Sequence, residues 1–114
     1  MNSGRYNLTI DQGIDFNQVF TYKIGITPVD LTGYTARLNI SKKFFKSSKP
    51  VIDLTTENSK LVLGGALGTI TATMSSAETL FFTEEDQYSY DLELVIGSSV
   101  SRLLRGKVII IGDA

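Results

Sequence analysis

Two carboxylates, Asp91 and Glu93, come nearest to enzyme chemistry in this sequence. They lie two residues apart in an alternating segment, and strand geometry places their side chains on one face about 7 Å apart. Glycosidases use such a pair, but they also need a cleft and a raised pKa on one of the acids. A simpler interpretation is a solvated sheet face on which the acids lie opposite Arg102 or Arg105 of the next strand. We expect this second arrangement.

Other catalytic and metal-binding patterns are missing from the sequence. The 114 residues include no histidine and no cysteine, which removes the commonest general base, the commonest transition-metal ligand and all thiol chemistry. The acidic run at 84–86 lacks EF-hand spacing and is expected to be a solvated turn. The glycine-rich segment 64–68 leads into a strand, whereas a phosphate-binding loop opens a helix. We therefore predict a non-enzymatic protein with no cofactor and no bound metal.

The most unusual segment, "SKKFFKSSKP" at 41–50, surrounds two adjacent phenylalanines with four lysines. Three interpretations fit it: an ordinary loop, a protein–protein contact with an aromatic anchor and a soluble rim, or a nucleic-acid or membrane contact. The net charge of −1 provides no general attraction to nucleic acid or to an anionic membrane, so we predict neither partner. The predicted contact residues here are Lys42, Lys43, Phe44, Phe45 and Lys46.

The last strand-like segment ends in "KVIIIGDA", which is apolar on both faces. One interpretation is a strand that exposes one apolar face unless a neighbouring molecule covers it, which would favour an oligomer. The other is a strand buried on both faces within its own domain. Under the first interpretation, Ile109 and Ile111 join the predicted partner contact.

Alternation of apolar and polar residues dominates the rest of the chain and predicts half-buried strands. The predicted inward residues, strand by strand, are Tyr6, Leu8 and Ile10; Phe16, Phe20, Tyr22 and Ile24; Ala36, Leu38 and Ile40; Ile70, Ala72 and Met74; and Tyr88, Tyr90, Leu92, Leu94 and Ile96. Shorter strands are expected at 51–55 and 60–64, and segments 87–96 and 100–109 should form a hairpin. Ser75 and Glu78 have the spacing of a capping box, which predicts one helical turn in "SSAETL".

These elements predict one domain over residues 1–114, an all-β, immunoglobulin-like antiparallel β-sandwich of about seven strands with one short helical turn. An open barrel is the alternative. No apolar run approaches the roughly 18 residues that span a bilayer, and the N-terminal segment lacks the apolar core of a signal peptide. We accordingly expect a chain that is not exported by that route and does not bind membranes.

Several segments, in order, resemble a family of small structural proteins of tailed bacteriophages and prophages. They are "NLTIDQG" (7–13), "PVDLTGYTARLNI" (28–40), "LTTENSKLVLGGALGTITATMSSAET" (54–79) and "YSYDLELVIGSSVSRLLRGKVII" (88–110). The motifs of this family, in chain order, include I-x-Q-G, D-L-T-G-Y-T-A-R, Y-x-Y-D-L-E-L and R-L-L-x-G-x-V. The lysine–phenylalanine segment departs from the family, whose loop at that place has proline and small residues.

The resemblance implies an immunoglobulin-like component of the virion, made in the bacterial cytoplasm and built into the tail, baseplate or neck. Such proteins serve as adaptors, present in several copies, on which fibres or neighbouring ring proteins dock. Other virion structural proteins and further copies of the chain are the implied partners, and no catalytic residue is carried over. A capsid decoration or head–neck protein, and a receptor- or carbohydrate-binding module, are the alternatives.

Overall fold

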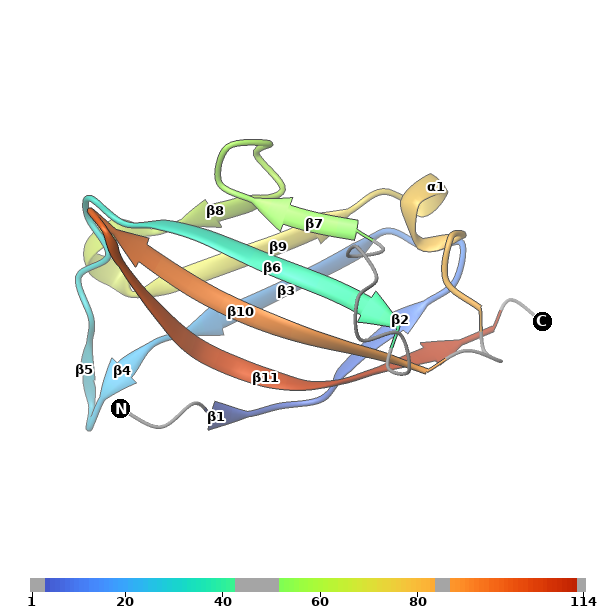
Figure 1. Ribbon diagram of the computed structural model, residues 1–114, viewed down its shortest axis with the longest axis horizontal. Helices are drawn as coiled ribbons and strands as arrows, with labels where there is room; N and C mark the ends of the chain where they lie inside the picture. Colours follow the sequence, from blue (N-terminus) through green and yellow to red (C-terminus); the bar gives the residue numbers. More distant parts are fainter. Residues whose placement is uncertain (1–3, 43–51, 84–86, 113–114) are drawn as a thin grey trace.

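The computed structural model describes residues 4–42, 52–83 and 87–112. These residues form two β-sheets packed face to face, a small separate hairpin, one short α-helix and one turn of 3₁₀-helix. Figure 1 shows the larger sheet in front of the smaller one, with helix α1 at the end of the sandwich where the chain terminates. The all-β prediction is therefore correct.

The larger sheet has six strands, with β11 and β10 at its centre. Its strands are β1 (Gly4–Arg5), β2 (Leu8–Asp11), β6 (Thr35–Lys42), β7 (Ile52–Thr55), β10 (Tyr88–Ile96) and β11 (Ser99–Ile111). They follow the order β1-β11-β10-β6-β7, and β2 continues beside β11. The predicted hairpin is confirmed, because β10 and β11 pair antiparallel across the turn at Gly97.

The smaller sheet has three strands in the order β3-β9-β8. These are β3 (Phe16–Thr21), β8 (Leu61–Leu63) and β9 (Thr69–Met74). The turn η1 (Gly65–Leu67) joins β8 to β9, so the glycine-rich segment is part of a hairpin and leads into a strand, as predicted. A second hairpin, β4 (Lys23–Ile24) and β5 (Thr27–Pro28), extends beyond the sandwich (Figure 1).

The strand order is that of an immunoglobulin-like sandwich, with β11, β10, β6 and β7 in one layer and β3, β9 and β8 in the other. The two sheets stay separate, because within the described residues no strand joins β3 or β8 to the larger sheet. This arrangement excludes the open barrel. The described residues contain eight strands of three or more residues and three of two residues, where about seven strands were expected.

One pairing differs from the predicted antiparallel arrangement. Strands β1 and β2 both pair parallel to β11. An alternating pattern specifies which face of a strand is buried, but it is the same for parallel and antiparallel neighbours. The direction of these strands therefore had to come from the tertiary structure.

The core lies between the sheets and contains most of the residues predicted to point inward. Leu38, Ile40, Ile70, Ala72 and Leu92 have no exposed surface. Burial of such side chains is the main contribution to the stability of a domain of this size, at about 1.5–3 kcal/mol for each large one. The core needs neither the disulfide nor the tryptophan of antibody domains.

Three of the predicted inward residues are instead exposed. Ile24 is 69% exposed because the chain leaves the small sheet after Thr21, and Ile96 is 43% exposed at the end of its strand. Tyr6 is 48% exposed, but its ring packs edge-on against Phe20 of β3, with 6.2 Å between the ring centroids. Tyr6 thereby links the first segment of the chain to the opposite sheet.

The N-terminal segment runs beside β11 and approaches it most closely at a glycine. A Cβ atom added at Gly106 would lie 2.1 Å from the carbonyl oxygen of Tyr6, closer than any real contact. The buried hydroxyl of Tyr90 donates a hydrogen bond to that same carbonyl. Burial, and secondarily the neighbouring Tyr6, raise the pKa of Tyr90 to about 12, so this donor keeps its proton at neutral pH.

A tyrosine corner stands at the start of β10. The hydroxyl of Tyr88 accepts a hydrogen bond from the backbone N–H of Thr83, five residues upstream, at 3.1 Å. The Tyr88 ring also packs edge-on against the fully buried Phe82, at 5.0 Å between centroids. Many immunoglobulin-like domains fix the same sheet-to-sheet connection in this way.

The segment from Pro28 to Tyr34 forms a corner before β6. Asp30 accepts hydrogen bonds from the backbone N–H of Thr32 at 3.0 Å and from its hydroxyl at 2.6 Å. These bonds, the side-chain one first, lower the pKa of Asp30. Gly33 has a φ of 87°, a backbone angle that other residues rarely adopt. Leu31, which follows Asp30, is buried in the core. The corner therefore has a structural role.

Candidate functional site

The structure describes three of the residues predicted to contact a partner. They are Lys42, Ile109 and Ile111. Lys43, Phe44, Phe45 and Lys46 lie outside the described residues, as does the acidic run 84–86. The site is therefore built from the end of β11 and from the elements around it.

Ile109 and Ile111 lie on the outer face of β11. Val108 and Ile110 between them are 5% and 8% exposed and belong to the core, whereas Ile109 and Ile111 are 45% and 48% exposed. Of the two interpretations of this strand, the structure selects the one with one buried face and one uncovered face. Strand β2 pairs with β11 here and covers its edge, but it leaves the outer face open.

Lys42 lies apart from these isoleucines. It is half-buried at the end of β6, and its register partner is Tyr88 of β10. The inward residues of β6 have even numbers, so Lys42 lies on the inner face of the sheet. Strand β10 separates β6 from β11, which places the two strands roughly 10 Å apart. Lys42 and the two isoleucines therefore do not form one surface.

Three further exposed apolar residues belong to segments 12–14 and 79–82, which meet near the end of β11 through hydrogen bonds. Ile14, Leu80 and Phe81 are 59%, 56% and 73% exposed. We refer to Ile14, Leu80, Phe81, Ile109 and Ile111 together as the apolar end. The sequence contains a pattern that could have indicated Leu80 and Phe81. The three apolar residues "LFF" (80–82) directly follow the helical turn, and of these only Phe82 lies in the core.

Hydrogen bonds between three segments hold the apolar end together. Gln12 donates its backbone N–H to the carbonyl of Ile111 at 2.9 Å and its side-chain amide to the carbonyl of Phe82 at 2.7 Å. The buried hydroxyl of Thr79 lies 3.0 Å from the carbonyl of Ile14 and accepts the N–H of Gly13 at 3.0 Å. Segments far apart in sequence thus meet at a fixed junction.

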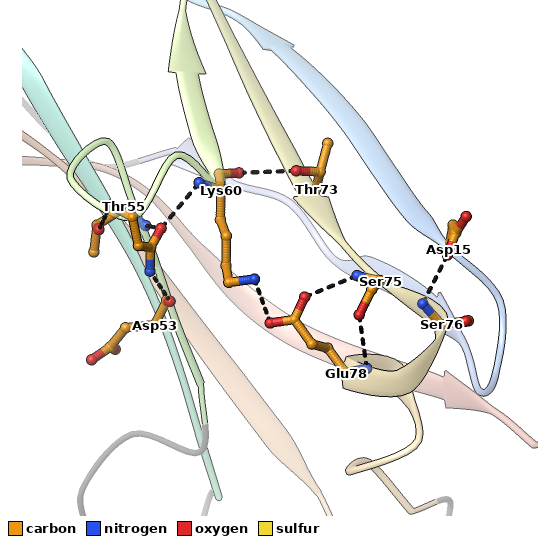
Figure 2. A network of polar contacts seen from close by, with 9 residues as sticks. Asp15, Asp53, Thr55, Lys60, Thr73, Ser75, Ser76 and Glu78 are labelled. Atoms are coloured by element: carbon orange, nitrogen blue, oxygen red, sulfur yellow. Dashed lines mark hydrogen bonds and ion pairs between the residues drawn. The ribbon is translucent and has the colours of Figure 1, made fainter.

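A polar network borders this junction on the side of α1 (Ser76–Thr79) and is drawn in Figure 2. Ser75 and Glu78 form the predicted capping box, in which each side chain accepts a hydrogen bond from the backbone N–H of the other. The ammonium of Lys60 lies 2.6 Å from the Glu78 carboxylate, and Asp15 accepts the N–H of Ser76 at 2.8 Å. The helical turn is therefore tied to the residues that directly precede β3 and β8 of the smaller sheet.

A cavity of about 510 Å³ lies beside this network and is lined by Lys60 and Glu78 among others. The hydrogen bond from Lys60, followed by that from the Ser75 backbone, lowers the pKa of Glu78. A general acid working near neutral pH needs the opposite shift. Asn58 in the same wall accepts the N–H groups of Thr55 and Lys60, at 3.0 Å each, and so shapes the turn before β8. These groups hold backbone in place.

The paired carboxylates Asp91 and Glu93 occupy the polar outer face of β10. Asp91 lies 3.4 Å from Arg102 of β11, as predicted, but Glu93 pairs at 2.7 Å with Arg37 of β6, on the other side. The register between β10 and β11 shifts between Leu92 and Glu93, so the sequence alone could not determine which neighbouring strand supplies the arginine that pairs with each acid. Both acids therefore take part in exposed ion pairs between strands, each worth about 0–1 kcal/mol.

The described residues contain no cluster of three or more acidic, histidine or cysteine side chains that could hold a metal ion. Among the same residues, no helix has the length and apolar character to cross a membrane.

Comparisons of the chain with models of known protein families and with curated protein sequences give no match.

Proposed function

We propose that this chain is a non-enzymatic structural module of a tailed-bacteriophage virion. It is an adaptor of the tail, baseplate or neck that assembles in several copies and docks fibres or neighbouring ring proteins. Support comes from the sequence resemblance and from the apolar end. The apolar end carries the proposal, because five large apolar side chains, each 45–73% exposed, belong to three segments that meet at one junction of the fold.

Burial of the apolar end against a neighbouring protein provides an energy of the right size for assembly. Five half-exposed side chains supply on the order of 5 kcal/mol, since full burial of each contributes about 1.5–3 kcal/mol. Association of two proteins costs an estimated 4–15 kcal/mol, so one such contact alone binds weakly. Several copies in one particle make the same contact together, which turns weak contacts into a stable assembly.

The rigid support of the apolar end favours the same role. The hydrogen bonds of Gln12 and Thr79 fix the three segments before any partner binds. A preorganised surface loses less conformational entropy on binding than a mobile one. The apolar end therefore suits docking between rigid virion parts.

Mass spectrometry and cryo-electron microscopy of purified virions test this proposal. We expect the chain in the particle, in the tail region and at the small copy number of a ring. A copy number on the scale of the capsid lattice would assign it to the capsid instead. Absence of the chain from purified virions would refute a virion role altogether.

A further inference from the structure

Strand β3 is the longest open edge of the smaller sheet. In the part of the chain that the structure describes, β9 pairs with one side of β3 and nothing pairs with the other. The opposite edge of this sheet, β8, has three residues, whereas β3 has six. The first strands of the chain, β1 and β2, pair with β11 and not with β3.

The register of β3 identifies the backbone groups that face outward. The N–H of Tyr22 donates to the carbonyl of Gly68 at 2.8 Å, which makes this a hydrogen-bonded pair of the β3–β9 ladder. Such pairs alternate along an antiparallel ladder, so the even-numbered residues of β3 bond to β9. The N–H and C=O groups of Asn17, Val19 and Thr21 accordingly face away from the sheet. Among the described residues, the only contact with them is a 3.3 Å bond from the Gln18 side chain to the carbonyl of Val19.

This edge lacks the features that usually prevent strand addition. Proteins protect open edges with charged residues, proline, bulges or very short strands. The sequence of β3, "FNQVFT", has no charge, no proline and no glycine, and its register with β9 is regular throughout. Val19 at its middle is 51% exposed. Beside the edge lies a hollow of about 340 Å³, lined by Val19 and Thr21 of β3 and by Gly4 and Tyr6 of the N-terminal segment, among others, so this segment leaves space next to β3.

We propose that β3 pairs antiparallel with β3 of a second copy of this chain, about a two-fold axis at Val19. In this register, Val19 faces Val19 of the partner subunit, and Asn17 faces Thr21 of the partner subunit. All three positions become hydrogen-bonded pairs, and the two small sheets join into one of six strands.

The second copy is the occupant that the chemistry of the edge favours. Two-fold pairing places the half-exposed valines against each other and the polar side chains of Asn17 and Thr21 together, and no charge meets another. The inference deepens the proposed multi-copy role by naming a contact between copies. Its test uses the purified protein, so its failure is distinct from absence of the chain from virions.

Single cysteines test the register directly, because the chain has no cysteine of its own. Val19→Cys should form a disulfide-linked dimer under mild oxidation, since Cα atoms of a hydrogen-bonded pair lie about 5.5 Å apart, within disulfide range. Val62→Cys is the matched control. Val19 and Val62 both neighbour Thr71 of β9, one on each side, and are 51% and 58% exposed.

A mixture of Asn17→Cys and Thr21→Cys proteins extends this test. We expect the mixed disulfide between the two proteins, and little disulfide within either one, because identical positions would lie about 14 Å apart. Self-linking of Asn17→Cys would refute the two-fold register. Cross-linking of Val19→Cys no greater than that of Val62→Cys would refute pairing at this edge.

Sedimentation of the cysteine-free protein gives an independent measurement. We expect a concentration-dependent dimer, which Val19→Pro weakens about thirtyfold because it removes both outward N–H donors of the central pair. The fold should survive, as judged by circular dichroism, since that N–H does not bond to β9. A protein that stays monomeric at all concentrations, or a dimer insensitive to Val19→Pro, would overturn the proposal.

Discussion

At the scale of single residues, several sequence motifs have a steric or hydrogen-bonding explanation. Gly106, the glycine of "RLLRGKV", leaves room for the Tyr6 carbonyl, and Tyr90 of "YSYDLEL" donates a hydrogen bond to it. Gln12 of "TIDQG" joins the end of β11 to the segment after α1. These residues position the N-terminal segment and the apolar end.

Replacement of Gly106 by alanine should destabilise the fold. Strand propensity alone favours alanine slightly, but the added Cβ would meet the Tyr6 carbonyl at 2.1 Å, and such overpacking costs about 1–3 kcal/mol. Urea denaturation measures the loss. Ser101→Ala, at an exposed position of the same strand, is the control and should change stability by less than about 0.5 kcal/mol. Equal stability of the two variants would contradict the close approach of the Tyr6 carbonyl to Gly106.

The ion pair of Glu78 predicts a pH dependence. Because its folded-state pKa is lowered, the ionised carboxylate adds stability above the unfolded-state pKa, and this stability is lost as the pH falls through the folded-state pKa. Glu78→Gln should therefore cost about 0.5–1 kcal/mol at neutral pH and nothing in strong acid. Urea denaturation of both proteins across the acid range measures this difference. A loss in the free energy of unfolding that is the same at every pH would show that the charge of Glu78 does not contribute to stability.

At the scale of elements, the connection from β9 to β10 determines how the sheets are joined. The capped turn α1 begins it, and the tyrosine corner of Tyr88 and Thr83 ends it. The capping box was predictable, because its spacing is local in sequence. The tyrosine corner was not, since its acceptor and donor meet only once Tyr88 is buried as the first residue of β10.

Removal of the Tyr88 hydroxyl should loosen this connection. Tyr88→Phe keeps the ring contact with Phe82 but removes the acceptor of the Thr83 N–H, at a cost of about 1–3 kcal/mol. Thermal unfolding measures the effect. Tyr34→Phe is the control, because the structure gives the Tyr34 hydroxyl no hydrogen-bond partner among the described residues. The tyrosine corner would have no energetic role if both variants melted alike.

At the scale of the whole molecule, the exposed surfaces form two distinct candidates for assembly. The apolar end surrounds the C-terminal part of β11, whereas the open edge of β3 lies along the smaller sheet. Under the proposals made above, the first contacts a different virion protein and the second contacts another copy. Each can be altered without touching the core.

Ile109→Asp with Ile111→Asp separates assembly from folding. Both side chains are half-exposed on the outer face of β11, so we expect the purified protein to fold with a melting temperature near that of the wild type. We also expect at least about tenfold less of this variant in purified virions, since charges on the surface prevent its burial. Val62→Asp, equally exposed on the smaller sheet, should be incorporated normally. Normal incorporation of the double variant would exclude these residues from the contact.

The sequence by itself determined most of the longer strands and their buried faces, the β10–β11 hairpin and the capped turn. Each depends on alternation or on short spacing, which are local properties of a chain. Only the tertiary structure decided the parallel pairing of β1 and β2, the partners of Asp91 and Glu93, the junction that gathers Ile14, Leu80 and Phe81 beside β11, and the open edge of β3. These depend on which segments lie side by side across long sequence separations, and an alternating pattern is the same whichever neighbour a strand has.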